Sequence, residues 1–149
     1  MTLFCSGYIE IKTFDGTKWL KDIKIGDLVL THLGNYREVF QVKKIRYPRC
    51  FNSGVFDIYF LVEDDACKGG FREEGIHRIT GDHLVFCSNG TKKFVRDIKK
   101  GDILSISKGR KARVILSLEI PKENHGEFLY GLEIKKDHSY YADNVCVND

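Results

Sequence analysis

The residues Thr80-Gly81-Asp82-His83 combine the side chains and the spacing that a site for amide activation needs. The two residues in the middle favour a turn, and the apolar run Leu84-Val85-Phe86 that follows predicts a strand. Thr80 and His83 should therefore flank a tight turn and point at one place. A hydroxyl beside an imidazole suits polarising an amide and protonating its nitrogen. Taken alone, a histidine after a turn is more often structural, so the motif needs support from the rest of the chain.

The candidate amide is the chain's own, at Phe4-Cys5. A thiolate is a natural nucleophile, and attack of Cys5 on the carbonyl of Phe4 would exchange an amide for a thioester. This exchange is uphill in water, so it requires a polarised amide and a proton for the leaving nitrogen. Thr80 and His83 are suited to both tasks. Without them, Cys5 would be interpreted as an idle thiol near the terminus.

The last residues of the chain offer a second reactive centre. Val145 and Val147 alternate as a strand, so this tail should be built into a sheet rather than frayed. Asn148 and Asp149 are the residue types whose side chains can attack the backbone and close a five-membered ring. His138 begins this stretch and could donate a proton or position the tail.

Composition excludes several other classes of protein. The 149 residues, of which 42% are hydrophobic, favour one soluble domain with a real core. The formal net charge of +3 is too balanced to indicate nucleic acid or a membrane surface as a partner. No apolar run approaches the roughly 20 residues of a membrane span. The five cysteines are widely spread without a CxxC pair, which argues against a zinc ribbon or a disulfide scaffold and favours the reducing cytosol.

The elements that must position these residues are predicted to be strands. Period-two patterns and turn signals bound the predicted strands, and no confident amphipathic helix is found. The charged, glycine-rich segment 63–75 is predicted to be an exposed loop. The predicted strands cover residues 8–13, 28–31, 36–45, 55–62, 84–86 and 145–147.

An internal repeat supports a pseudo-symmetric β architecture. Gly26-Asp27 recurs 75 positions later as Gly101-Asp102, each within an Asp-Ile-Lys-x-Gly-Asp segment, and Phe56 to Phe60 resembles Tyr130 to Ile134 at an offset of 74. We further predict that Asp82-His83 corresponds to Asp137-His138. Two similar β units would then bring two histidines to related places. The alternative is a purely structural repeat without a shared site.

Taken together, these motifs resemble those of mini-inteins, self-splicing elements with the hedgehog/intein (Hint) fold. Cys5 with Asp22 to Asp27 resembles the N-terminal splicing motif, and Thr80-Gly81-Asp82-His83 resembles the Thr-x-x-His motif. Residues 130–134 and 138–149 resemble the two C-terminal motifs run together. The resemblance covers residues 5–149, so residues 1–4 would be upstream flanking (N-extein) sequence. About 150 residues is the size of the splicing domain without an inserted endonuclease.

The resemblance implies an all-β, pseudo-twofold, horseshoe-like Hint domain that splices once, autocatalytically and without a cofactor or metal. Cys5 would take the upstream flank as a thioester, with Thr80 and His83 activating the Phe4-Cys5 bond. A nucleophile of the downstream flank, absent from this chain, would accept the acyl group. His138 would assist cyclisation at the C-terminal end, formed by Asn148-Asp149, which would excise the domain, and the flanks would be ligated.

The chain departs from the family at four points. Asn148-Asp149 stands where the family usually has His-Asn, so either Asp149 cyclises or Asn148 does and Asp149 belongs to the flank. Gly131 occupies the place of an aspartate that coordinates the two ends in many members. The segment from Cys5 to Gly16 is about one residue shorter than usual. The chain also stops at Asp149, without a downstream acceptor.

The alternative function is a Hint-type domain that cleaves or transfers without ligation, and a non-enzymatic β binding module is a third hypothesis.

The expected partners are the flanking extein segments in cis. The family tolerates insertions or a natural split near residues 107–125, and a split protein would add a complementary intein fragment. The basic segment 107–111 is interpreted as a solvated turn, so neither nucleic acid nor a membrane is expected as a partner. We expect a monomer in the reducing cytoplasm, within a microbial or phage host protein.

Overall fold

The structure, a computed structural model, describes residues 4–46, 54–64, 70–121 and 128–149. These ranges contain strands, turns and short 3-10 helices but no α-helix, and no helix in them is long and apolar enough to cross a membrane. The all-β prediction is therefore confirmed. In chain order the strands are β1 (Cys5–Ser6), β2 (Glu10–Thr13), β3 (Gly16–Trp19), β4 (Leu28–Leu30), β5 (Tyr36–Arg46), β6 (Val55–Asp64), β7 (Gly70–Thr80), β8 (Leu84–Phe86), β9 (Lys92–Phe94), β10 (Ile103–Ser105), β11 (Lys111–Glu119), β12 (Phe128–Ile134), β13 (Ser139–Ala142) and β14 (Val145–Asn148).

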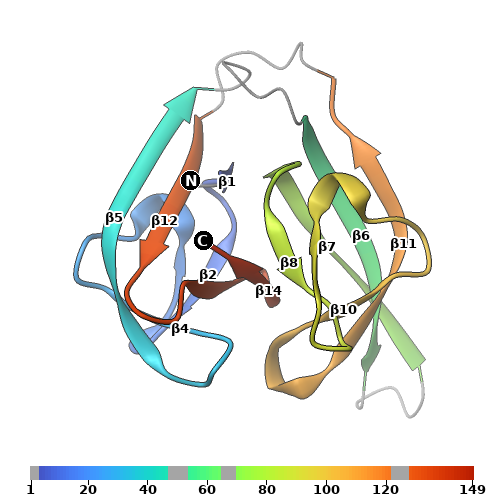
Figure 1. Cartoon of the computed structure of the whole chain (residues 1–149), viewed down its shortest axis with the longest axis horizontal. Helices are drawn as coiled ribbons and strands as arrows, with labels where there is room; N and C mark the ends of the chain where they lie inside the picture. Colours follow the sequence, from blue (N-terminus) through green and yellow to red (C-terminus); the bar gives the residue numbers. More distant parts are fainter. Residues whose placement is uncertain (1–3, 47–53, 65–69, 122–127) are drawn as a thin grey trace.

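The strands form two sheets that give the molecule two facing wings (Figure 1). The larger sheet runs β1-β12-β5-β4-β2-β13-β14-β8-β9, with β3 attached to β2, and the smaller sheet runs β10-β11-β6-β7. Strands β5 and β12 build one wing, and β6, β7 and β11 build the other. Strands β1 and β14, which carry the two ends of the described chain, lie between the wings. This arrangement agrees with the predicted horseshoe-like fold.

The repeat seen in the sequence is also a structural repeat. Asp27 accepts hydrogen bonds from Lys24 N and from Lys18 Nζ through its carboxylate. Asp102 has the same two contacts one repeat later. The short helices η1 (Leu20–Asp22) and η3 (Val95–Asp97) precede these turns at matching positions. The equivalent hydrogen bonds of the second half are Lys99 N to Asp102 Oδ2 (3.0 Å) and Lys93 Nζ to Asp102 Oδ2 (2.8 Å), and the turns are joined to the next strand by Gly26 N to Val39 O (2.9 Å) and Gly101 N to Val114 O (2.9 Å).

The two halves exchange one strand each. Strand β6 follows β5 in the chain but pairs with β11 and β7, whereas β12 returns to pair with β5 and β1. Cys5 pairs with Tyr130 in the one half, and Ile79 pairs with Phe56 in the other. Ile79 follows Cys5 by 74 positions, and Tyr130 follows Phe56 by the same number. Cys5-Ser6 and Ile79-Thr80 therefore occupy equivalent places in the two halves.

The hairpin of β13 and β14 lies between the two halves. Ala142 of β13 pairs with Ile11 of β2, and Val147 of β14 pairs with Val85 of β8. Ile11 and Val85 are themselves 74 positions apart and equivalent in the repeat. The hairpin therefore occupies the local twofold axis and joins the halves through both of its edges.

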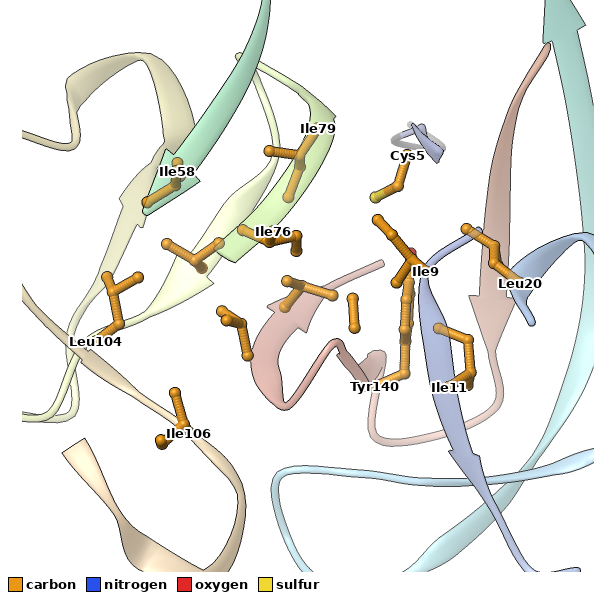
Figure 2. Close-up of a cluster of buried hydrophobic side chains, with 14 of the residues drawn as sticks. Cys5, Ile9, Ile11, Leu20, Ile58, Ile76, Ile79, Leu104, Ile106 and Tyr140 are labelled. Atoms are coloured by element: carbon orange, nitrogen blue, oxygen red, sulfur yellow. The ribbon is translucent and has the colours of Figure 1, made fainter. Parts of the chain in front are cut away.

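The hydrophobic core is continuous across this axis. Figure 2 shows Ile9 and Ile11 of one half and Ile76 and Ile79 of the other on opposite sides of the hairpin. Tyr140 of β13 extends through the core toward Cys5. A buried cluster that spans both halves ties the position of each reactive end to the packing of the whole domain.

Two predictions about the elements are wrong. Segment 63–75 is not a loop, because β6 extends to Asp64 and β7 begins at Gly70, where the two residues pair, and residues 65–69 lie outside the described residues. Of its described charged residues, Arg72 and Glu73 are exposed on β7, and composition alone could not distinguish such an exposed strand from a loop. The correspondence of His83 with His138 is also wrong. The strand pairing makes His83 equivalent to Ile9 of the other half, and the hairpin that follows His138 lies on the axis instead.

Candidate functional site

The turn from Thr80 to His83 connects the end of β7 with the start of β8. His83 N donates a hydrogen bond to Thr80 O at 3.0 Å, and Val95 N donates to His83 O at 2.8 Å. Thr80 and His83 are both buried. The other half contains the same turn at Ser6 to Ile9, where Ile9 N donates to Ser6 O at 3.3 Å. The fold therefore fixes the histidine from both sides and directs it into the interior, as the motif predicted.

Thr80 contacts both polar groups of Phe4. The Thr80 main-chain N–H donates to the Phe4 carbonyl oxygen at 3.0 Å, and Phe4 N–H donates to Thr80 Oγ1 at 3.3 Å. The prediction that the hydroxyl would polarise the Phe4-Cys5 amide is therefore wrong in its atom. The main-chain N–H contacts the carbonyl of that bond, while the hydroxyl holds the preceding amide. A fixed N–H donor on a carbonyl oxygen can stabilise the negative charge that develops there under nucleophilic attack.

Cys5 and His83 form a buried pair. The distance from Cys5 Sγ to His83 Nδ1 is 3.7 Å, and neither residue is accessible to solvent. Burial raises the pKa of the Cys5 thiol above its ordinary range, and the Tyr140 hydroxyl offsets this only in part. Burial also lowers the pKa of His83 to about 3, with a small opposing effect from the Asn148 backbone. At neutral pH the pair is thus an uncharged thiol beside an uncharged imidazole, which can act as a base.

Tyr140 lies at the same place, and sequence reasoning assigned it no role. Its ring centroid is 6.4 Å from that of His83 at an interplanar angle of 67°, and the side chain is fully buried. Its hydroxyl has no hydrogen-bond partner of good geometry within the described part of the chain. The only sequence signal was its position two residues after His138 in a strand that must enter the core.

The C-terminal residues form a second centre beside the first. Asp149 Oδ2 accepts a hydrogen bond from Ile134 N at 2.6 Å and lies 3.3 Å from His138 Nδ1. Asp149 N donates to His138 O at 3.0 Å. The Asp149 side chain is 8% exposed, whereas that of His138 is 59% exposed. The structure thus places the carboxylate, rather than the histidine, inside the protein.

Asn148 contacts different groups from those of Asp149. Its Oδ1 accepts a hydrogen bond from Lys92 Nζ at 2.9 Å, and its Nδ2 donates to Asp149 O at 3.2 Å. The structure therefore groups the six predicted site residues into two centres, which adjoin where the Asn148 backbone contacts His83. Cys5, Thr80 and His83 form one centre, and the other three form the second.

The segment around His138 is held by a group of contacts that sequence reasoning missed. His138 has a left-handed backbone with φ of 52°, which is costly for a residue with a Cβ. Asp137 accepts hydrogen bonds from Thr31 Oγ1, at 2.6 Å, and from Asn35 and Arg37. On the other side, Ser139 Oγ lies 2.6 Å from His32 Nδ1. The turn between β4 and β5 thereby holds the segment on both sides of His138. The four residues that hold the segment, Thr31, His32, Asn35 and Arg37, are all far from His138 in the sequence.

A small open pocket adjoins the second centre. It has a volume of about 220 Å³ and is lined by Phe40, Glu133, His138 and Asp149. Gly131, which stands where a coordinating aspartate was expected, lies buried in β12 opposite Lys43 and has no side chain to offer. Within the described residues there is no group of three histidine, cysteine or acidic side chains that could hold a metal ion.

Comparisons with known proteins find similarity at the level of structure. The sequence matches no protein-family model and no curated protein. The crystal structure of the gp41-1 intein superposes with a TM-score of 0.71 at 20% identity, covering 100% of this chain and 99% of that one. The solution structure of a bacterial intein-like domain from Clostridium thermocellum gives 0.69 at 19% identity, covering 100% and 99%. The Ssp DnaB mini-intein variant M86 gives 0.65 at 13% identity, covering 98% and 92%. The chain therefore has the fold of inteins, the Hint fold, over its whole length.

Proposed function

We propose that this chain is a protein-splicing element that transfers its upstream flank from the nitrogen to the sulfur of Cys5. The observation that carries the proposal is the set of groups around one peptide bond. The Thr80 N–H donates to the Phe4 carbonyl oxygen, while His83 Nδ1 lies 3.7 Å from the Cys5 sulfur. A donor for the developing oxyanion and a base for the thiol are what an acyl shift requires.

In the first step, neutral His83 takes the thiol proton as Cys5 Sγ attacks the Phe4 carbonyl carbon. The Thr80 N–H stabilises the resulting oxyanion. The C–N bond to Cys5 then breaks, the C–S bond remains, and the protonated imidazole returns the proton to the leaving nitrogen. No proton is gained or lost overall, and the product is a thioester. The low pKa of His83 favours this return, because its protonated form is a strong acid in the buried site.

In the later steps, a thiol or hydroxyl of the first downstream residue attacks the thioester and the Cys5 thiolate leaves. The end of the domain then closes a ring. If Asp149 cyclises, its carboxylate oxygen attacks its own carbonyl carbon, the bond to the flank nitrogen breaks, and water later opens the anhydride. His138, 3.3 Å from the carboxylate, is placed to hold it and to protonate the leaving amine. The released amine attacks the ester or thioester to join the flanks.

The second candidate is a Hint-type domain that cleaves or transfers without ligation. The observation that favours it is Asp149, since a carboxylate is a weaker nucleophile than a deprotonated amide for ring closure. The alternative in which Asn148 cyclises requires its Nδ2 to reach its own carbonyl carbon, whereas that amide donates to Asp149 O.

The remaining parts of the proposal follow from this reaction. Residues 1–4 are upstream flank, residues 5–149 are the splicing domain, and the partners are flanks in cis. The free thiols of Cys5, Cys87 and Cys146 suit a reducing cytoplasm. Cys50 and Cys67 lie outside the described residues. A natural split near residues 107–125 also remains a proposal: residues 107–119 form the short helix η4 (Ser107–Gly109) and β11, and residues 122–127 lie outside the described residues.

Intact mass after incubation with an excess of a small thiol at neutral pH tests the proposal. We expect the wild type to lose Met1-Thr2-Leu3-Phe4, because the external thiol intercepts the thioester. Cys5→Ala should lose nothing, and Cys146→Ala, a matched change of another buried thiol, should react like the wild type. Retention of the four residues by the wild type would overturn the acyl shift at Cys5.

A second experiment distinguishes splicing from cleavage alone. A downstream segment that begins with Cys is fused after Asp149, and the products are identified by mass. Ligated flanks would support splicing. Separate flanks without any ligated product, under every condition that permits cleavage, would favour the second candidate.

A further inference from the structure

Among the described residues, Tyr140 is the largest fully buried side chain, and packing of the core accounts for its ring but not for its hydroxyl. The ring lies among Ile9, Ile11 and other core residues, as a phenylalanine could (Figure 2). Its hydroxyl adds a polar group at the centre of the fold. A buried hydroxyl without a partner is less favourable than an apolar replacement, because it loses its hydrogen bonds to water. A phenylalanine would avoid this cost, so the hydroxyl calls for a separate explanation.

The surroundings of the hydroxyl identify what it faces. Tyr140 points from β13 toward Cys5 (Figure 2), and its ring lies 6.4 Å from that of His83. Among the described residues no acceptor satisfies the hydroxyl with good geometry. The Cys5 sulfur nevertheless lies within its range, since each group shifts the pKa of the other: the hydroxyl lowers that of the thiol, and Cys5 and Asp149 raise that of Tyr140 beyond the effect of burial. The donor is thus aimed at a sulfur that is still an uncharged thiol and a poor acceptor.

We infer that Tyr140 is a further catalytic residue, whose hydroxyl donates a hydrogen bond to the Cys5 sulfur when that sulfur carries negative charge. The inference deepens the proposed function and rests on it. The sulfur becomes negative twice: when the thiol proton moves to His83 as the sulfur attacks, and when the thiolate leaves the thioester in the transfer to the downstream nucleophile. In neither step does Tyr140 gain or lose its proton. It supplies a hydrogen bond that strengthens as charge develops, in a site that excludes water.

This role places one group between the two reactive ends. Tyr140 lies on the axial hairpin, and Asp149, at the end of the partner strand, is close enough to raise its pKa. Strand β13 therefore connects the stability of the Cys5 thiolate to the docking of the C-terminal strand.

The test compares Tyr140→Phe with Tyr141→Phe, a matched change of the half-buried neighbour, whose hydroxyl interacts with Cys146. We expect Tyr140→Phe to slow thiol-dependent loss of residues 1–4 at least about tenfold, the usual effect of losing a hydrogen bond to a charged group. Its melting temperature should be equal to or higher than that of the wild type, because an unpaired buried hydroxyl is removed. Tyr141→Phe should retain the wild-type rate. An unchanged rate in Tyr140→Phe would overturn the inference.

A measurement that needs no turnover separates this inference from the proposed function. The Cζ carbon of tyrosine reports the hydrogen bonding of its hydroxyl in NMR spectra. The Tyr140 signal should move on Cys5→Ala and stay in place on Cys146→Ala. If the wild type releases nothing in thiol, the acyl shift fails, and the NMR comparison alone decides whether Tyr140 contacts the sulfur. A Tyr140 signal indifferent to Cys5→Ala would overturn the contact.

Discussion

The sulfur of Cys5 lies 3.7 Å from Nδ1 of His83, although 78 positions separate the two residues in the chain. They come from opposite halves of the repeat and meet where neither is exposed to water. Many reactive cysteines are thiolates paired with a cationic histidine. Here burial keeps both groups uncharged, since the pKa of the thiol is raised and that of the imidazole is lowered. In the proposed mechanism, the thiolate and the imidazolium therefore form only when the sulfur attacks.

Replacing His83 should abolish the first step. His83→Gln keeps a polar side chain of similar size but supplies no base, so thiol-dependent loss of residues 1–4 should fall by about 10²-fold or more, the usual contribution of general acid–base catalysis. His77→Gln is the matched control, because His77 is about half exposed and pairs with Asp57. Intact mass against time gives both rates. A His83→Gln rate near that of the wild type would contradict the assignment.

Changes at Thr80 should have a smaller effect than the motif suggests. Thr80→Ala removes the hydroxyl that holds Phe4 N but keeps the main-chain N–H on the Phe4 carbonyl oxygen. We expect a loss of about tenfold or less, with Thr80→Ser close to the wild type. A loss in Thr80→Ala as large as that of His83→Gln would show that the hydroxyl, rather than the main chain, activates the bond.

Stability should fall in mild acid because of His83. Its pKa is about 3 in the folded protein and near 6.5 when unfolded, so between these values the unfolded chain binds a proton that the folded chain does not. The free energy of unfolding should therefore decrease as pH falls from 6.5 toward 3, by up to about 1.4 kcal/mol per pH unit. Urea titrations at several pH values measure this slope. His83→Gln should show a shallower slope, and equal slopes would indicate that His83 is protonated in the folded state.

The contacts of Asp137 should matter for C-terminal cleavage only. Asp137→Ala removes the acceptor for Thr31, Asn35 and Arg37 and frees the strained backbone of His138. In a chain with a downstream segment, C-terminal cleavage should slow several-fold while thiol-dependent cleavage at Cys5 keeps its rate. Asp22→Ala, a change at an exposed aspartate, serves as the control. Equal slowing of both cleavages would mean that Asp137 supports the whole fold instead.

Restoring an amide at the terminus should restore ring closure. Asp149→Asn retains an oxygen that can accept from Ile134 N and supplies a nitrogen nucleophile that forms a succinimide. With a downstream segment that begins with Cys, we expect C-terminal cleavage to rise at least about tenfold and ligated flanks to increase. Asn148→Asp is the matched control and should not have this effect. If neither variant cleaves faster at the C-terminal end, a step before ring closure limits the rate.

Local patterns predicted much of this fold and of the site. The period-two runs identified β4, β5, β6, β8 and β14 closely, and the Gly-Asp repeat predicted the pseudo-twofold arrangement. The Thr80-His83 turn was predictable because its residues are adjacent, as is the entry of the tail into a sheet. These features depend on contacts within a few residues, where spacing determines geometry.

The parts that the sequence did not predict depend on long-range pairing. The exchange of β6 and β12 between halves is decided by the partner strands, so the sequence could not show that Ile9, rather than His138, is the counterpart of His83. The contact of Thr80 N–H with Phe4 O depends on the direction of the main chain, which the types of the side chains hardly indicate. The contact of Asp137 with Thr31 and that of Tyr140 with Cys5 join residues more than 100 positions apart.

The place of the β13–β14 hairpin sets the time at which the chemistry can begin. Cys5 comes early in the chain and His83 near its middle, but the strands that close onto β2 and β8 come last. On a ribosome, the reactive bond would thus wait in an inactive state while most of the domain is being made. Arrival of the final strand completes the dry interior that neutralises His83 and brings Tyr140 to the sulfur. For the splicing function proposed above, this order would keep the Phe4-Cys5 bond intact until the domain has folded.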